Sequence, residues 1–141
     1  LSGVSLLAQS LPPFPWYLGG QRFCNLFVSS EEIAEFAEVS NLGICFDTSH
    51  SRLACTYFET SFAQFANTVL PVTQHLHLVD GKGVDVEGVQ IGEGDIDWPT
   101  FCGQLDVQAR GVRFIPEIWQ GHVDHGSGFW KALERLEGLL A

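Results

Sequence analysis

Gly43-Ile44-Cys45-Phe46-Asp47 is a short apolar run that ends in a carboxylate, and no other stretch of the chain says more about its architecture. A run of this kind is typical of a strand that is buried in a parallel sheet. The same pattern, a short apolar run closed by a polar residue, occurs at three further places. These are residues 4–8 before Gln9, residues 75–76 before His77, and residues 112–116 before Glu117.

Helical patterns lie between these runs, so the sequence predicts an α/β fold with a parallel sheet. Ser29 and Glu32 have the spacing of a helix capping box. Residues 60–70 and 128–139 carry apolar stripes with a helical period, and a shorter helix is expected over residues 98–105. The glycine-rich stretch 81–94 is expected to be a loop. The whole chain, residues 1–141, is then one domain of four β/α units, which is half of an eight-stranded barrel.

Composition excludes several classes of protein. The net charge of −10, from 7 basic and 17 acidic residues, disfavours nucleic acid as a partner. No apolar run approaches the roughly 20 residues that span a bilayer, so no membrane association is expected. Four cysteines without a CxxC spacing indicate a reducing compartment, and we expect a cytoplasmic protein. The chain begins at Leu1 and contains no methionine, which favours a fragment of a longer polypeptide over a processed N-terminus.

The polar residues that close the four runs are the candidate functional residues. The carboxyl ends of parallel strands meet at one edge of a sheet, so Gln9, Asp47, His77 and Glu117 are expected to lie together. Oxygen and nitrogen donors in one cluster suit a divalent metal such as Mn, Mg, Co or Zn. Asp47 could instead be a helix N-cap, and His77 could be a hydrogen-bonded core histidine. His75 has the parity of His77 and is expected to pack behind it.

Four segments carry a resemblance to a known family when they are taken in order. They are Asp47-Thr48-Ser49-His50, His75-Leu76-His77-Leu78-Val79-Asp80, Ile91-Gly92-Glu93-Gly94-Asp95-Ile96-Asp97 and Pro116-Glu117-Ile118-Trp119. Together they resemble the second half of the xylose-isomerase-like TIM barrels, which include sugar isomerases, sugar epimerases and type IV apurinic endonucleases. The resemblance runs from about residue 4 to residue 139. It implies that the four units are strands 5–8 of a (β/α)8 barrel.

The resemblance also implies roles for individual residues. In ketose 3-epimerase-like members, Glu, Asp, His and Glu from the last four strands hold one divalent metal, and these positions fall on Gln9, Asp47, His77 and Glu117. His50 matches a histidine that contacts the substrate. The implied activity is a metal-dependent isomerase or epimerase acting on a small sugar or sugar phosphate, with Glu117 and His50 as catalytic residues.

Two departures from the family pattern narrow these implications. The endonucleases carry an Asp-x-His metal motif before the G-x-G turn, where this chain has Val86-Glu87-Gly88, so DNA repair is disfavoured. Gln9 replaces a glutamate, and an amide cannot accept a proton from the sugar carbon. Two-base epimerisation is therefore disfavoured, whereas metal binding and a one-base isomerisation or dehydration remain open. The alternative is a non-catalytic binding or assembly domain, and residues 114–136 also resemble isomerase-type domains appended to sialic-acid-synthase-like enzymes.

Several residues outside the strand ends are weaker candidates. Lys82 could contact a substrate or its phosphate, and Trp16 could belong to an aromatic lid over the pocket. Asp80 is expected to lie in a solvated turn. His122 and His125 are expected on the surface.

A half barrel also predicts a partner. Its first and last strands leave backbone edges unpaired, and Leu7, Phe46 and Phe114 are expected on the inward face. Exposing that face would leave a large apolar patch. We therefore expect either a homodimer or a complex with an N-terminal half barrel.

Overall fold

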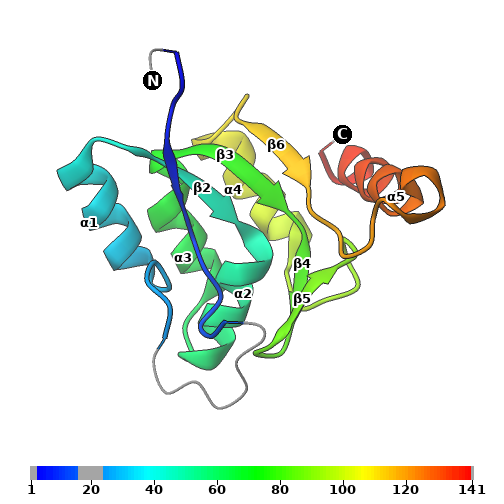
Figure 1. The fold of residues 1–141 in the computed structure, drawn as a ribbon, viewed down its shortest axis with the longest axis horizontal. Helices are drawn as coiled ribbons and strands as arrows, with labels where there is room; N and C mark the ends of the chain where they lie inside the picture. The colour runs from blue at the N-terminus through cyan, green and yellow to red at the C-terminus, as the bar shows by residue number, and fades with distance from the viewer. Residues whose placement is uncertain (1–2, 16–23, 141) are drawn as a thin grey trace.

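A four-stranded parallel sheet forms the centre of the molecule, as the sequence predicts. The computed structural model describes residues 3–15 and 24–140 (Figure 1). The strands are β1 (Leu7–Gln9), β2 (Gly43–Asp47), β3 (Thr73–Leu78) and β6 (Arg113–Pro116). They lie in the order β1-β2-β3-β6, and every neighbouring pair is parallel. Chain order and spatial order agree, which is the arrangement expected of consecutive β/α units.

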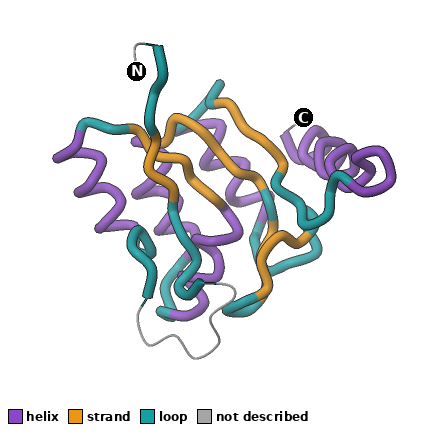
Figure 2. The backbone as a smooth tube through the Cα atoms, in the orientation of Figure 1, coloured by secondary structure: helices purple, strands orange, loops and turns teal. Residues whose placement is uncertain are grey.

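The helices follow the strands and gather on one side of the sheet. They are α1 (Ser30–Ser40), α2 (Thr48–Tyr57), α3 (Phe62–Val69), α4 (Trp98–Gln108) and α5 (Val123–Leu140), with a 3₁₀ turn η1 (Leu70–Val72). Figure 2 shows α1, α3 and α4 behind the sheet, with α5 beside β6. No helix in the described part of the chain is long and apolar enough to cross a membrane.

The helix boundaries show where sequence patterns succeed. Ser29 caps α1 by accepting a hydrogen bond from the Glu32 amide at 3.2 Å, as the capping box predicts. No apolar stripe predicts α2, although Asp47 is a possible N-cap for a helix here; the buried residues of α2 include Thr48, Ser49 and Ser51. A helix that buries hydroxyl groups lacks the apolar stripe on which pattern recognition depends.

Phe46 faces the helices, so its expected place on the inward face is wrong. Its ring is fully buried and lies 5.8 Å from Phe65 and 5.9 Å from Phe101 between centroids. Phe114 is in register with buried Leu76, which puts it on the same helical side. Side chains alternate along a strand, so a face that carries Asp47 cannot also carry Phe46. Leu7, in register with Gly43, does lie on the Asp47 face.

The stretch expected to be a loop contains an antiparallel hairpin. Its strands are β4 (Asp80–Lys82) and β5 (Val86–Val89). Asp80, expected in a solvated turn, is instead completely buried. Its carboxylate accepts hydrogen bonds from the amides of Gly81, Gly92 and Ile96 at 2.9, 2.9 and 3.2 Å, and from Trp98 Nε1 at 2.7 Å. This one side chain therefore fixes both the start of the hairpin and the segment that leads into α4.

Replacing Asp80 with alanine should destabilise the protein by about 3 kcal/mol or more, because four donors, three of them buried, would lose their acceptor. Urea denaturation followed by circular dichroism measures the change. Asp85→Ala, in the exposed turn of the same hairpin, is the matched control and should leave the midpoint unchanged. Equal midpoints for the two variants would show that Asp80 has no such role.

Candidate metal centre and its cavity

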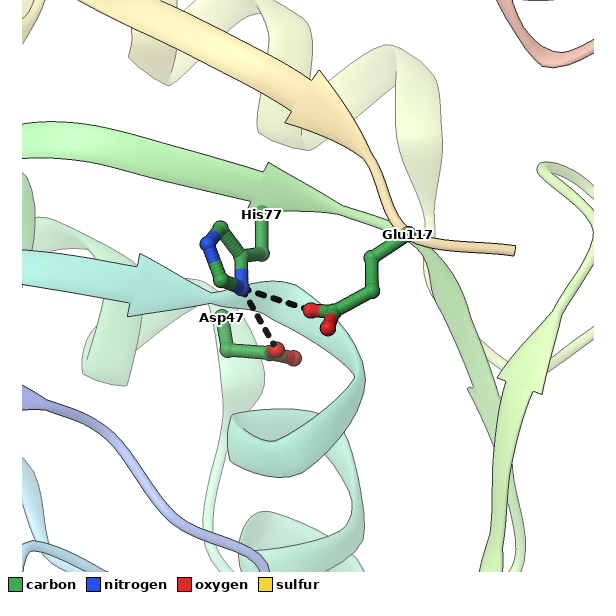
Figure 3. Close-up of side chains that lie close together, drawn as sticks. All are labelled: Asp47, His77 and Glu117. Carbon is green, nitrogen blue, oxygen red and sulfur yellow. Dashed lines mark ion pairs between the residues drawn. The ribbon is translucent and has the colours of Figure 1, made fainter. Parts of the chain in front are cut away.

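Asp47, His77 and Glu117 converge at the carboxyl ends of three neighbouring strands. Asp47 ends β2 and is in register with His77 on β3, while Glu117 directly follows β6. His77 Nδ1 lies 2.6 Å from Glu117 Oε2 and 3.5 Å from Asp47 Oδ2 (Figure 3). One ligand atom from each residue falls within 4.8 Å of the others. The convergence expected from the strand ends is therefore present.

The two oxygens of the Asp47 carboxylate have different partners. Oδ1 accepts a hydrogen bond from the His50 amide at 3.0 Å and so caps α2. Oδ2 faces His77 and the rest of the cluster. The Asp47 backbone amide donates to Ser10 Oγ at 3.0 Å, and the side chain is only 1% exposed. The sequence leaves two roles for Asp47 as alternatives, helix N-cap and member of the cluster. In the structure Asp47 has both roles.

Thr48 ties the two strand ends together behind the cluster. Its hydroxyl donates to the carbonyl of Val79 at 2.7 Å and accepts from the Val79 amide at 3.0 Å. The same oxygen lies 3.1 Å from the His77 carbonyl. Because Thr48 follows Asp47 directly, these bonds fix the separation of Asp47 from His77.

The environment of His77 stabilises a positive charge at its ring. The buried Asp47 carboxylate, the Cys45 thiol and Glu117 together raise the pKa of His77 far above its ordinary value near 6.5, against the opposing effect of burial. Asp47 contributes most because it is buried, whereas Glu117 is 51% exposed and screened by water. His75 stacks edge-to-face on His77 at 5.6 Å and does not belong to the ligand cluster, in line with its expected packing role.

Gln9 reaches the cluster, but with its amide nitrogen. Nε2 donates to Asp47 Oδ2 at 3.3 Å and lies 3.3 Å from His77 Nδ1. A Gln9 that binds a metal would turn its amide oxygen to the cluster, and in this structure the amide nitrogen faces the cluster instead. The physical reason is that an N–H group is attracted to a carboxylate, whereas an amide oxygen is repelled by it.

His50 lies beside the cluster, and the sequence did not predict its partner. Nδ1 lies 3.1 Å from the Ser10 carbonyl and 3.4 Å from Asp47 Oδ2, and Nε2 lies 3.2 Å from Glu87 Oε2. Burial lowers the pKa of His50, but the hydrogen bond to Glu87 and the charge of Asp47 outweigh it and raise the pKa to about 8. Glu87 lies on β5. Because the sequence did not indicate the hairpin that contains β5, it could not predict that Glu87 would lie beside His50.

A cavity of about 300 Å³ opens next to these side chains. This volume is within the range of small-molecule sites. Its lining comes from three places: the start of α2, the hairpin, and the loop that follows β6. The lining residues are Asp47, Ser49, His50, Val79, Glu87, Gly88, Glu117, Ile118, Trp119, Gln120 and His122.

The remaining candidates lie in different places. Lys82 is exposed on β4 and does not line this cavity. Trp16 is outside the described residues. His122 is exposed as expected and also lines the cavity, whereas His125 is exposed at a positive φ of 60° and does not. The substrate contacts predicted for Lys82 and Trp16 therefore stay predictions.

The chain belongs to the xylose isomerase-like TIM barrel family, whose model matches residues 2–138. This match confirms the family resemblance, and together with the four parallel strands it confirms the half-barrel fold. No curated protein sequence matches the chain significantly.

Solved structures show the same relationship. A D-tagatose 3-epimerase-like protein is 25% identical, with a TM-score of 0.70, over 98% of this chain and 47% of that one. An L-ribulose 3-epimerase (14% identity, TM-score 0.68, 98% and 48% coverage) shares the fold. So does the D-psicose 3-epimerase from Clostridium cellulolyticum H10 solved with D-tagatose (17% identity, TM-score 0.67, 98% and 50% coverage). The chain spans about half the length of the structures it matches.

Proposed function

We propose that this chain carries the metal-binding part of a sugar isomerase or epimerase. The observation that carries the proposal is the convergence of Asp47, His77 and Glu117 at the carboxyl edge of the sheet, beside a cavity of about 300 Å³. In barrels of this kind the carboxyl edge is where catalytic residues gather. The similarity to a D-tagatose 3-epimerase-like protein supports a ketose as substrate.

The donor set fits a divalent cation. Two carboxylates and one imidazole offer oxygen and nitrogen ligands to Mn, Mg, Co or Zn, and the two negative charges balance the ion. His77 must lose its proton to the solvent when its Nδ1 binds a metal. The Gln9 carboxamide can rotate to turn its oxygen toward the ion, because the carboxylate that now attracts its N–H would be neutralised. Gln9 would then be a neutral fourth ligand.

Glu117 is the base that this arrangement supports. It is 51% exposed and lines the cavity, so its carboxylate can reach a bound sugar. A bound divalent ion would polarise the sugar carbonyl and so make the neighbouring carbon more acidic. Gln9, on the far side of the cluster, cannot accept the proton. The residues therefore favour a one-base isomerisation over a two-base epimerisation.

The charge of the cavity favours an uncharged sugar over a sugar phosphate. Asp47, Glu87 and Glu117 line it, and none of its described lining residues is a lysine or an arginine. Three carboxylates against the one imidazole whose pKa is raised, that of His50, leave the lining negative, and a negative lining repels a ligand of the same sign. Lys82, the residue that the sequence offered as a phosphate contact, lies outside this lining.

A non-catalytic binding domain of the same fold is the second candidate, and the Gln9 replacement is the observation that favours it. A domain that only binds would retain the metal ligands and the cavity but would need no second base. Metal binding is therefore common to both candidates, and proton exchange at the sugar separates them.

Replacing Asp47 with asparagine should weaken binding of Mn²⁺ about 100-fold or more, because the cluster loses a charged ligand. Asparagine is itself a good N-cap, so α2 should persist. Isothermal titration calorimetry measures the affinity. His122→Ala, in the same cavity but outside the cluster, is the control and should bind as the unmodified protein does. Equal affinities for Asp47→Asn and the control would remove the basis for a metal centre.

Gln9→Glu should raise the rate of proton exchange between a ketose and solvent by about 100-fold or more, because it supplies the missing base. The exchange is followed by NMR in D₂O on the assembled, metal-loaded protein. Gln9→Leu removes the amide without adding a base and should give no increase. Rapid epimerisation by the unmodified protein would show that another residue provides the second base.

We also propose that the chain works as part of a closed barrel, with either a second copy or an N-terminal half barrel. Within the described residues, β1 and β6 each pair on one side only. Ile115 on the open face of β6 is 44% exposed, and Val4 and Leu6, which precede β1, are 61% and 63% exposed. Free parallel edges with exposed apolar side chains are surfaces that other strands can pair with.

The isolated chain at micromolar concentration should therefore sediment as a dimer or larger species. Ile115→Lys should weaken the association, since it adds a charge to the open face of β6. Val107→Lys, at an 82% exposed position on α4, is the control and should leave it unchanged. A monodisperse monomer with cooperative unfolding would contradict the proposal.

A further inference from the structure

We propose that Glu87 is a positioning residue that fixes the ring of His50 in the cavity, and that a sugar hydroxyl binds across the His50–Glu87 pair. The cavity holds three carboxylates, and two of them belong to the metal cluster. Glu87 is the third, and its Oε2 lies 3.2 Å from Nε2 of the His50 imidazole. The pairing rests on geometry alone, whereas the identity of the ligand rests on the proposed function.

The backbone that carries Glu87 is held in place from both sides. Gly88 accepts a hydrogen bond from the Trp119 amide at 2.9 Å, which joins β5 to the loop after β6. At the tip of the hairpin, the Gly83 amide donates to Asp95 Oδ2 at 2.8 Å. A surface acid on a mobile loop would sample many positions, but these contacts restrict Glu87 to one side of the cavity.

The contact between β5 and this loop requires glycine at position 88. Gly88 has a φ of +76°, and a Cβ built on it would lie 2.8 Å from Trp119 Cβ. Any other residue would push the hairpin away from the loop and move Glu87 with it. The glycine next to Glu87 therefore sets how far the carboxylate reaches into the cavity.

Two acceptors on opposite sides of the ring fix the orientation of His50. Nδ1 lies 3.1 Å from the Ser10 carbonyl, and Nε2 lies 3.2 Å from Glu87 Oε2. A carbonyl and a carboxylate can only accept, so both ring nitrogens donate. Without Glu87 only the Ser10 side would hold the ring, and Nε2 would bond to water instead. His50 and Glu87 are 19% and 25% exposed, so a ligand in the cavity can reach both.

A hydroxyl group matches this pair because it both donates and accepts. It can replace Glu87 as the acceptor of the His50 Nε2–H and donate its own hydrogen to the Glu87 carboxylate, so that the hydroxyl bridges the two side chains. A phosphate group offers only acceptor oxygens and negative charge, which Glu87 repels. The pair therefore selects a polyol such as a ketose, and Glu87 itself is not one of the proposed metal ligands.

The pairing is tested by NMR of the His50 ring in ¹⁵N-labelled protein. The Nε2–H of His50 should be protected from solvent exchange in the unmodified protein and in Glu87→Gln, whose amide oxygen remains an acceptor. Glu87→Ala should lose that protection, and Asp85→Ala, which removes a charge from the exposed turn of the same hairpin, should retain it. Unchanged protection in Glu87→Ala would overturn the proposal.

The ligand is tested by calorimetric titration of the Mn²⁺-loaded protein with D-tagatose. Glu87→Ala should lower the affinity about 10-fold, Glu87→Gln should restore most of it, and the Mn²⁺ affinity of both variants should be unchanged. Equal sugar affinity in Glu87→Ala and Asp85→Ala would overturn the role in substrate binding. If the unmodified protein binds no ketose while the ring protection responds to Glu87→Ala, the positioning role stands and the proposed function fails.

Discussion

The Asp47 carboxylate is the interaction on which the rest of the site depends. One of its oxygens caps α2, and the other faces His77 and Gln9. Asp47 both caps α2, where the chain turns from strand to helix, and belongs to the cluster. A change at this residue therefore affects the fold and the site together. Because α2 starts at this point, Thr48 is placed to clasp the end of β3, and His50 is placed at the cavity wall. A side chain with this double role is expected to be rigid, and rigidity is what a cluster of ligands needs in order to bind without a large loss of entropy.

A second buried carboxylate, Asp80, does for the hairpin what Asp47 does for the helix. It gathers four donors from residues that lie up to 18 positions apart in the chain. Gly94 makes this possible, because a Cβ there would lie 2.4 Å from Asp80 Oδ1. The ordered segment that results carries Glu87 to one side of the cavity and, through Gly88, meets the loop after Glu117. Asp47 therefore fixes the side chains at the carboxyl edge of the sheet, and Asp80 fixes the hairpin that lines the cavity beside it.

The open face of the sheet is more polar than a barrel core would need for stability alone. Register places Gln9, Cys45, His75 and Arg113 side by side across the strands, with Asp47, His77 and Glu117 at the carboxyl side of this row. The apolar aromatic cluster around Phe46 lies instead beneath the helices. The aromatic core therefore lies on one face of the sheet, and the candidate site lies on the other. This division explains how half a barrel can have a well-packed core while its other face stays open.

The sequence by itself determined the four strands, the polar residue at or next to the carboxyl end of each one, and the gathering of Asp47, His77 and Glu117, because parallel strands bring their carboxyl ends to one edge whatever packs around them. It also determined the start of α1, since a capping box is a local signal. Tertiary structure decided the rest. Which face Phe46 occupies depends on where the helices lie, and the polar helix α2 is held by hydroxyl contacts with distant segments, Thr48 with Val79 and Ser51 with Ser10. The partnership of His50 with Glu87 joins residues 37 positions apart through a hairpin fixed by Asp80. Such contacts depend on the folded positions of several segments at once, and no local pattern of residues encodes them.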